Sequence, residues 1–331
     1  MPPLISVIIP AYNAEGFICQ AIQSVLAQTC QPYEIIVIDD GSTDRTNEVL
    51  KSFREQIHYV YQKNKGPSAA RNAGIKLAQG ELICFLDADD LWTPEKLDEQ
   101  LSFMEAHPEI AMVFSDHEEF NEEGLVLASY LGEKRKAFQV FPIKIGPIDN
   151  AFEKLVIENF ISTPTVMLRK SCLEKTGLFD EAIRSVEDRD LWMRISAAFS
   201  IACIPSIYCK RRFHEGNISS QRELTLQGRI RVLEKNWNLF PALVSDRIWR
   251  QQLADYRCAL GFLLLQKGRK RDAFQAGFQN FSNNLKRRNW FWSLPEPFVM
   301  VKSFGLLCAA LLGWNVSRFL WKPIKRIRVT L

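Results

Sequence analysis

Short β-branched apolar runs alternate with segments of helical periodicity over the first 120 residues, and this alternation restricts the fold more than any other feature. A compact apolar run is typical of a buried strand, whereas apolar residues three and four apart mark one face of a helix. Short links between the two kinds of segment indicate a mainly parallel sheet flanked by helices. We predict an α/β fold with strands near 4–12, 33–40, 57–62, 81–90 and 110–120 and helices near 15–28, 41–53, 66–80 and 93–108.

Capping residues indicate where three of these helices begin. Ser42 and Thr43 are predicted caps of the second helix, because their side-chain oxygens can accept hydrogen bonds from free N–H groups. Pro67 stands at the start of the third helix, where a missing N–H costs nothing. Thr93 is the predicted cap of the fourth helix.

The pattern weakens after residue 120 and then returns in a different form. A chain of 331 residues has room for more than one domain. We predict loops and short elements at 121–160, a strand near 165–169 and a helix after Asp188. From 222 onward we predict a mostly helical C-terminal region. The predicted domains are a domain over 1–220, with halves of about 1–116 and 117–220, and a helical region over 221–331.

Cysteine usage and the N-terminal sequence favour a cytoplasmic location. The eight cysteines are scattered and form no CxxC pair, which argues against a disulfide framework and a zinc site and is typical of a reducing compartment. The stretch MPPLISVIIPAYN has no basic segment, long apolar core or small-residue cleavage site, so we expect no signal peptide.

The net charge of +4 conceals two oppositely charged parts. Residues 1–221 carry 22 Lys and Arg against 32 Asp and Glu, a balance of −10, whereas residues 222–331 carry 20 against 6, a balance of +14. A basic part of this kind attracts nucleic acid, phospholipid or another anionic partner. No nucleic-acid-binding motif is present, so we expect no nucleic acid partner.

The most apolar stretch, 298–314, lies in the basic part of the chain. Its 17 residues include Lys302 and are marginal for a helix that spans a membrane. Tryptophan on both sides and the basic end RFLWKPIKRIR favour a segment that lies on an anionic membrane surface, at the inner face of the cytoplasmic membrane. A buried C-terminal helix with a solvated tail is the alternative.

Polar residues follow three of the predicted strands, at the ends where an open parallel sheet binds ligands. No GxGxxG motif follows a strand, which disfavours a dinucleotide cofactor, and no GxxxxGK[ST] motif is present. The residues at these strand ends are Tyr12 and Asn13, Asp39 and Asp40, and Asp87 and Asp89.

Asp87 and Asp89 form a predicted metal site. In an extended segment, residues i and i+2 point to the same side. Two carboxylates on one side offer hard oxygen ligands to Mg²⁺ or Mn²⁺, which keeps positions open for phosphate oxygens. The predicted cofactor is therefore a divalent ion that holds a diphosphate. A solvated acidic turn, with Asp90 as a local cap, is the alternative.

Four further residues have both a functional and a structural interpretation. Asp40 either accepts the N–H of a nucleobase or forms a local turn or cap. Arg71, in the small-residue segment SAARNAG, either contacts a phosphate or forms a surface salt bridge. Asp188 is either a general base or the cap of the following helix. His214 is favoured as a solvated loop residue over a contact with metal or phosphate.

Four segments occur in order along the chain, namely SVIIPAYN, EIIVIDDGSTD, GPSAARNAGIKLAQGELICFLDADD and GLFDEAIRSVEDRDLWMRIS. Together they resemble the family 2 glycosyltransferases over roughly residues 4–220. The resemblance implies a GT-A fold, with a Rossmann-like sheet and nucleotide-binding and acceptor-binding halves. It also implies inverting transfer of a sugar from a nucleotide diphosphate donor, with a UDP sugar favoured, to a hydroxyl.

The resemblance implies roles for individual residues. Asp188 matches the catalytic base, Asp40 the carboxylate that recognises the nucleobase, and Arg71 a donor-phosphate contact. Asp87 and Asp89 match the DxD pair, with Asp89 favoured as the direct metal ligand. The matches to the nucleotide-sugar-binding opening are Pro10, Ala11, Tyr12, Asn13 and Glu15.

The absence of a QxxRW motif, which processive members carry, favours addition of a single sugar. The expected acceptor is a glycan or a lipid-linked molecule of a cell-envelope polysaccharide. A nucleotidyltransferase is one alternative, although its first strand is normally followed by a Gly-rich basic loop, where this chain reads PAYNAEG. A non-catalytic carbohydrate-binding or scaffold protein is another, although it would not need Asp89 and Asp188 together.

Overall fold

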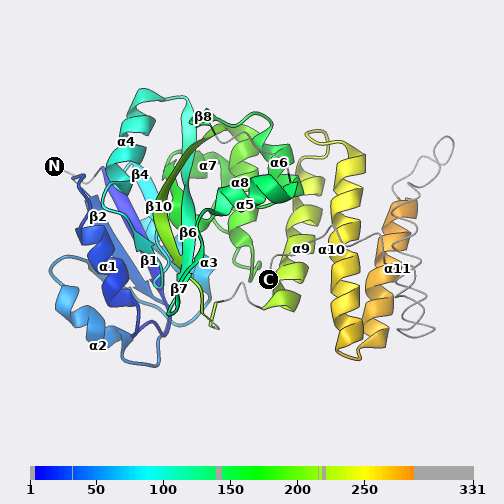
Figure 1. Cartoon of the computed structure of the whole chain (residues 1–331), viewed down its shortest axis with the longest axis horizontal. Coiled ribbons are helices and arrows are strands. Elements are labelled where there is room, and N and C mark those ends of the chain that lie inside the picture. The colour runs from blue at the N-terminus through cyan, green and yellow to red at the C-terminus, as the bar shows by residue number, and fades with distance from the viewer. Residues whose placement is uncertain (1–3, 32, 139–143, 215, 218–220, 287–331) are drawn as a thin grey trace. The chain divides into compact units, whose positions relative to one another are not determined.

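The computed structural model describes residues 4–31, 33–138, 144–214, 216–217 and 221–286 (Figure 1). The chain divides into two compact units, 1–217 and 218–331, which we describe separately.

A ten-stranded sheet organises the first unit. Its strands are β1 (Ile5–Ala11), β2 (Tyr33–Asp39), β3 (His58–Tyr61), β4 (Leu82–Phe85), β5 (Leu91–Trp92), β6 (Ile110–Asn121), β7 (Gly124–Leu127), β8 (Gly146–Pro147), β9 (Val166–Arg169) and β10 (Ser200–Arg212). The order across the sheet is β3-β2-β1-β4-β9-β6-β10-β5, while β7 pairs with β6 and β8 with β10. Strands β3, β2, β1 and β4 are parallel to one another, and β6 is parallel to β10. Strand β9 lies between β4 and β6 and is antiparallel to both.

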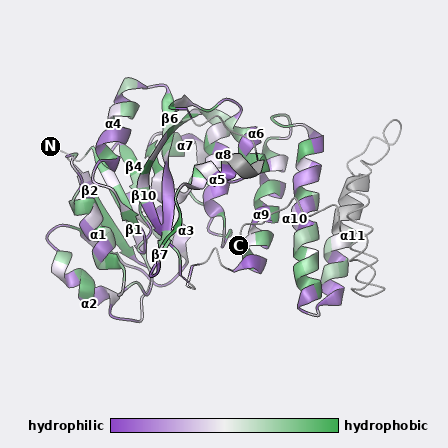
Figure 2. Ribbon diagram, in the orientation of Figure 1, coloured by the Kyte–Doolittle hydropathy of each residue, from purple (hydrophilic) through white to green (hydrophobic). Residues whose placement is uncertain are grey.

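Helices cover the sheet and connect its strands. They are α1 (Ile18–Leu26), α2 (Thr46–Leu50), α3 (Pro67–Leu77), α4 (Lys96–Ala106), α5 (Tyr130–Phe138), α6 (Ala151–Ile157), α7 (Cys172–Thr176) and α8 (Glu187–Ala198), with 3₁₀ turns η1 (Lys51–Phe53) and η2 (Thr163–Thr165). The apolar face of α1, with Ile18, Ile22 and Val25, packs into a core that includes Val7 of β1. Figure 2 shows the strands of this core coloured as hydrophobic. The predicted α/β fold is therefore confirmed.

Two of the predicted helix caps are wrong. The second helix begins only at Thr46, whose N–H is accepted by Asp44 at 2.9 Å, while Ser42 accepts the N–H of Asn13 at 3.0 Å. The fourth helix begins at Lys96 rather than after Thr93. The N-cap residues are Arg45 and Glu95, and neither makes a side-chain capping hydrogen bond. The start of α3 at Pro67 agrees with the prediction.

The long strand β10 was not predicted from the sequence, because Pro205 lies within it. Proline cannot donate to a strand ladder and therefore argues against a central strand. In the structure the register with β6 shifts between Ile204 and Ile207, and Pro205 lies at this irregularity. Beyond it the strand continues to Arg212 and leads into the loop that holds His214.

Helix α3 packs closely on β1 because Gly74 has no side chain. A Cβ atom at this position would lie 2.4 Å from Cγ2 of Ile8, which is closer than carbon atoms can approach. The small-residue segment SAARNAG thus brings the helix backbone against the sheet. This close packing places Arg71, three residues earlier, beneath the strand ends.

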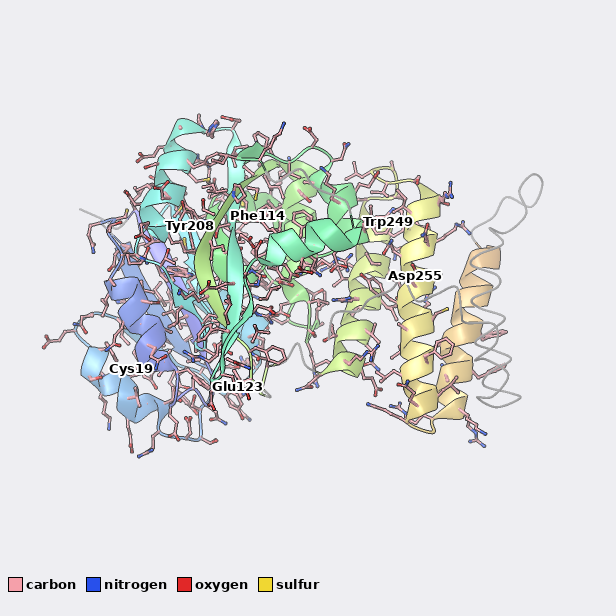
Figure 3. All side chains as sticks on the ribbon, viewed as in Figure 1. Cys19, Phe114, Glu123, Tyr208, Trp249 and Asp255 are labelled. Atoms are coloured by element: carbon pink, nitrogen blue, oxygen red, sulfur yellow. The ribbon has the colours of Figure 1, made fainter. Side chains whose placement is uncertain are left out.

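The second unit is helical in its described part, as predicted. It consists of α9 (Arg222–Leu239), α10 (Asp246–Gln266) and α11 (Lys270–Lys286), and α10 contacts both other helices. Trp249, labelled on α10 in Figure 3, stacks on Trp237 of α9 with ring centroids 6.0 Å apart. None of the helices in the described part of the chain has the length and apolarity needed to cross a membrane. The segment 298–314 lies outside the described residues.

Candidate active site

The polar residues that follow β1, β2 and β4 lie at one edge of the sheet. These strands end at Ala11, Asp39 and Phe85, and β1 pairs in parallel with both of the others. Their carboxyl ends therefore meet, as the sequence predicts for a ligand-binding edge.

The loop after β1 is joined to the loop after β2 by side-chain contacts. The Oδ1 atom of Asn13, whose φ is 48°, accepts the N–H of Thr43 at 2.8 Å. The Glu15 carboxylate accepts the N–H of Arg45 at 2.8 Å. Asn13 and Glu15 therefore fix the shape of this edge through contacts within the protein.

Pro10, Ala11 and Tyr12 lie where β1 reaches this edge. Pro10 and Ala11 belong to the strand, and Ala11 is buried. The side chain of Tyr12 is exposed, with a relative accessibility of 52% for the residue. Of these three predicted nucleotide-sugar contacts, Tyr12 has the side chain most open to a ligand.

Asp40 is buried and its carboxylate is engaged by the segment before α3. It accepts hydrogen bonds from the backbone N–H groups of Lys65 at 3.0 Å and Gly66 at 2.7 Å, and from the Gln62 amide at 2.6 Å. Gly66 has a φ of 91°, which glycine adopts without steric cost. Both oxygens thus hold a segment 22 to 26 residues further along the chain. The local turn considered from the sequence is formed instead by Asp39, which accepts the N–H of Ser42 at 2.8 Å.

Residues 87–90 form a turn, which we call the DxD turn, and not the extended segment expected from the sequence. Strand β4 ends at Phe85, and the N–H of Asp90 donates to the carbonyl of Asp87 at 3.1 Å. Asp90 is buried and accepts the N–H of Arg212 at 2.8 Å. The three carboxylates therefore point to different partners.

Arg71 bridges Asp87 and Glu187 in what we call the Arg71 bridge. Its Nη2 atom donates to Asp87 at 2.6 Å and its Nη1 atom donates to Glu187 at 2.7 Å. The guanidinium lies over the Phe179 ring, 5.5 Å from its centroid, and the residue is only 5% exposed. The salt bridge considered from the sequence is therefore buried and does not lie on the surface.

His214 contacts Asp89, which corrects its favoured interpretation as a solvated loop residue. Its Nε2 atom lies 2.9 Å from the Asp89 carboxylate, and the Asn217 amide donates to the same oxygen at 3.1 Å. The other ring nitrogen accepts the N–H of Gly216 at 3.1 Å, which places the proton of a neutral ring on Nε2. The ring also stacks on Phe17, with centroids 5.0 Å apart.

The DxD turn concentrates negative charge in a partly buried place. Burial, and then the charge of Asp87, raise the pKa of Asp89. Burial and the charges of Asp89 and Asp87 raise the pKa of Asp90 well above its ordinary value. Such crowding disfavours the ionised carboxylates, and a cation placed beside them would relieve it.

The residues at Asp89 fit a divalent ion that arrives with phosphate oxygens. Within the described ranges, no three His, Cys, Asp or Glu side chains converge as a metal site formed by protein alone would require. Mg²⁺ is commonly held by only one or two carboxylates, with the remaining positions filled by water and substrate phosphates. In this structure Asp87 is paired with Arg71, whereas the Asp89 carboxylate contacts His214 and Asn217, so Asp89 is the better placed of the two predicted ligands.

Asp188 is partly buried in the first turn of α8 and is held by few contacts. Its Oδ1 atom accepts the N–H of Arg189 at 2.6 Å, while the amide of Asn159 and the hydroxyl of Thr163 are 3.4 Å from its oxygens. Burial, and then the charge of Glu187, raise the pKa of Asp188 to about 6. Helix α8 begins one residue earlier, so Asp188 is not the N-cap that the sequence left open.

Sequence reasoning missed several residues at this site. Glu187 lies in the segment GLFDEAIRSVEDRDLWMRIS without a predicted role, and Asn159, Thr163 and Asn217 carry no motif. His214 could have been placed if β10 had been recognised, because a long strand beside β6 ends at the same edge as β4.

Comparison with protein families gives a match to "Glycosyl transferase family 2" over residues 6–176. An uncharacterized glycosyltransferase of Rickettsia felis is 39% identical over 216 residues, which are 64% of this chain and 33% of that protein. The chain thus spans about a third of the length of this and similar curated relatives. TuaG of Bacillus subtilis, a glycosyltransferase assigned to teichuronic acid biosynthesis, is 30% identical over 66% of this chain and 83% of its own length.

Solved structures with a similar fold include two bound to nucleotide sugars. TarS of S. aureus in complex with UDP-GlcNAc superposes with a TM-score of 0.58 at 21% identity, over 92% of this chain and 81% of that chain. The mannosyltransferase PcManGT from Pyrobaculum calidifontis, in complex with GDP-Man and Mn²⁺, superposes with a TM-score of 0.57 at 17% identity, over 98% of this chain and 84% of that chain. At these identities the likeness shows a shared fold, of the GT-A type.

Proposed function

The chain belongs to glycosyl transferase family 2, and from this premise we propose that it transfers a single sugar, with inversion, from a nucleotide diphosphate sugar to a hydroxyl. The observation that carries the proposal is the place of Asp188 in the first turn of α8, where its carboxylate accepts the N–H of Arg189 and its other contacts are 3.4 Å or longer. Its raised pKa, to about 6, agrees with this role. A carboxylate with such a pKa is ionised at neutral pH and still accepts a proton readily, which is the requirement for a general base.

In the proposed reaction Asp188 accepts the proton of the attacking hydroxyl. The hydroxyl oxygen forms a bond to the anomeric carbon of the donor, and the bond from that carbon to the diphosphate breaks on the opposite face. The nucleoside diphosphate leaves with the bonding electron pair. One displacement of this kind inverts the anomeric centre and needs no carboxylate nucleophile.

The donor is proposed to lie along the edge formed by the loops after β1, β2 and β4. Tyr12 offers an exposed ring there, and Asp40 lies buried beside the start of α3. A divalent ion, held by Asp89 and Asp87, would neutralise the charge that develops on the departing diphosphate. Mg²⁺ and Mn²⁺ both suit these oxygen ligands.

A screen of nucleotide sugars tests this proposal. UDP, GDP, dTDP and ADP sugars would be incubated with the full chain, MgCl₂ or MnCl₂ and simple glycan acceptors, and release of the nucleoside diphosphate would be measured. Metal-dependent release that rises with acceptor supports the proposal. Binding of the sugars without release would instead indicate a non-catalytic carbohydrate-binding protein.

Replacing Asp89 with alanine is expected to remove the effect of metal on nucleotide binding. Mn²⁺ should strengthen binding of UDP to the parent chain, since the ion joins carboxylate and phosphate oxygens, and it should not do so for Asp89→Ala. Calorimetric titration of UDP with and without MnCl₂ measures this. Glu122→Ala removes an exposed carboxylate of the same unit and is the control. Turnover that continues in excess EDTA would contradict the metal assignment.

The acceptor is proposed to be a glycan or lipid-linked molecule of an envelope polysaccharide, presented at the inner face of the cytoplasmic membrane. The +14 balance of residues 222–331 supports an anionic surface as partner. On α11, the rings of Phe274 and Phe278 stack at 6.3 Å and are 37% and 53% exposed, beside the exposed Lys270 and Arg271. Such a mixture of aromatic and basic side chains is typical of a surface that meets lipid headgroups.

The full chain is expected to sediment with vesicles that contain anionic lipid and to remain in solution with neutral vesicles. Each basic residue near the surface contributes about 1 kcal/mol, so replacing Lys322, Lys325, Arg326 and Arg328 with glutamine should weaken binding strongly. Added salt should weaken it partly, since inserted apolar groups are not screened. A parent chain that stays in the supernatant at low salt would refute membrane attachment.

A further inference from the structure

Val186, the residue before α8, has a backbone conformation that valine rarely adopts. Its φ of 58° and ψ of 28° lie in the left-handed region. Among the described residues other than glycine, only Asn13 and Asn150 also have positive φ values, and asparagine tolerates this region far better than a β-branched residue. Such strain persists only where the surroundings enforce it.

The Arg71 bridge is the interaction that can enforce this conformation. Glu187, the residue after Val186, accepts a hydrogen bond from Arg71 at 2.7 Å, and both side chains are almost fully shielded from solvent. A charge-assisted hydrogen bond between two shielded side chains is among the stronger interactions in a protein. The bridge can therefore hold the backbone of the residue beside Glu187.

The side chain of Asp188 has little else to fix its position. Its short hydrogen bond comes from the next residue of its own helix, and its contacts with Asn159 and Thr163 are 3.4 Å or longer. The position of the Asp188 carboxylate is therefore set by the backbone position of the first turn of α8.

We propose that the Arg71 bridge holds Val186 in its strained conformation and thereby positions Asp188 relative to the DxD turn. The bridge ties Asp87, two residues before Asp89, to Glu187, the residue before Asp188. Arg71, Glu187 and Val186 are positioning residues in this proposal. It rests on the proposed function, which gives Asp188 and Asp89 their roles.

The proposal predicts that the effect of replacing Glu187 depends on which residue stands at position 186. When the bridge is cut, Val186 gains by leaving the left-handed region, and the first turn of α8 moves with it. Glycine at position 186 occupies that region without steric cost, so it should keep the turn in place even without the bridge. Removing the bridge should therefore displace the first turn of α8 more in the parent chain than in the glycine variant.

A double-mutant cycle in the full chain tests this coupling, with Glu187→Ala, Val186→Gly and the pair together. Glu187→Ala leaves Arg71 paired one to one with Asp87, so no uncompensated buried charge remains and the chain should fold. Glu187→Gln is the conservative variant, because its amide oxygen can still accept the hydrogen bond from Arg71. Assays at pH 8 keep Asp188 ionised in every variant.

Hydrogen exchange of the peptide over 186–195 gives a readout that needs no substrate. The backbone N–H groups at the start of α8 should exchange faster in Glu187→Ala and return toward the parent rate in the double variant. Turnover of the best donor from the screen gives the second readout. We expect kcat to fall at least about 10-fold in Glu187→Ala, since small misplacement of a catalytic group can cost 10²-fold, and to recover at least about threefold in the double variant.

Donor affinity separates positioning from a general structural defect. The Kd of the donor's nucleoside diphosphate with Mn²⁺ should stay within about twofold in all variants, and Glu187→Gln should keep most of the parent kcat. A double variant no better than Glu187→Ala in both exchange and kcat would overturn the proposal.

Thermal melting of Val186→Gly provides an independent check. Val49→Gly is the matched control, because Val49 is also partly buried but lies in α2, where glycine is unfavourable. Val49→Gly should lower the melting temperature, whereas Val186→Gly should leave it unchanged or raise it. Equal losses would show that position 186 is unstrained and would refute the proposal. If Asp188→Asn keeps the parent rate, the proposed base fails instead, and the exchange data still decide the role of the bridge.

Discussion

Replacing Asp188 with asparagine is expected to lower sugar transfer by roughly 10²–10⁴-fold, which is the usual contribution of a positioned general base. Asparagine keeps the size of the side chain and an oxygen that can accept the N–H of Arg189, but it cannot take a proton. Affinity for the nucleoside diphosphate should therefore stay unchanged. Steady-state rates and calorimetric titration of the same preparation measure the two effects.

Asp98→Asn is the matched control for this change. Asp98 also lies in the first turn of a helix, α4, but it is exposed and has no predicted functional role. Its replacement should leave transfer unchanged. If Asp188→Asn lost donor affinity and rate in equal measure, Asp188 would be a structural residue and the proposed mechanism would be wrong.

The pH dependence of stability gives a second signature of the same carboxyl. The pKa of Asp188 is raised to about 6, above the value of 3.8 that applies when the chain is unfolded, so the folded state binds the proton more tightly. The carboxyl therefore costs no stability below about pH 4, and the cost grows as pH rises through 6, to a limit of about 3 kcal/mol. Asp188→Asn avoids this cost.

The variant should accordingly be more stable than the parent at pH 8 and equally stable near pH 4. Melting curves of both chains across this range measure the difference. Transfer by the parent should fall tenfold per pH unit below about pH 6, where the base becomes protonated. A stability difference that does not change with pH would contradict the raised pKa.

Replacing Arg71 with methionine is expected to cost roughly 3–5 kcal/mol of unfolding free energy, because it leaves the shielded Glu187 carboxylate and the partly buried Asp87 carboxylate without their cation. Asp87 and Glu187 both depend on this guanidinium, and the neutral side chain fills its space without pairing either. Urea denaturation of the parent and the variant at pH 7.5 measures the change.

Arg45→Met is the matched control, because Arg45 also pairs with a glutamate but is 76% exposed. Its salt bridge with Glu15 should contribute less than about 1 kcal/mol. Equal losses at the two positions would mean that the Arg71 bridge has no special energetic role. A variant of Arg71 that folds normally and loses only donor affinity would support the phosphate contact implied by the family resemblance.

The sheet and the helices of the first 120 residues were predictable because each element follows a local rule. Buried parallel strands are continuous apolar runs, and α1 shows its apolar face every three to four residues. The edge where Asp40 and Asp87 lie was predictable from the same rule, since parallel strands end together. These parts of the fold need no knowledge of distant contacts.

The partners of the site residues were not predictable, because they are set by distant segments. Arg71 meets Glu187 across 116 positions of the chain, and His214 meets Asp89 across 125. The turn at Asp87 also broke the expectation of two carboxylates on one side of a strand. Local sequence supplies the charged groups, whereas the packing of α3, α8 and β10 decides which of them pair.

Gly74 shows that the geometry of this site depends on a residue with no functional group. Any side chain there would meet Ile8 and push α3 away from β1, and the guanidinium one turn earlier would move with the helix. A variant at this position would be mistaken for an active-site lesion in a functional screen, although the residue carries no chemistry. An engineer who transplants the acidic residues to another scaffold must therefore also copy the distance between helix and sheet.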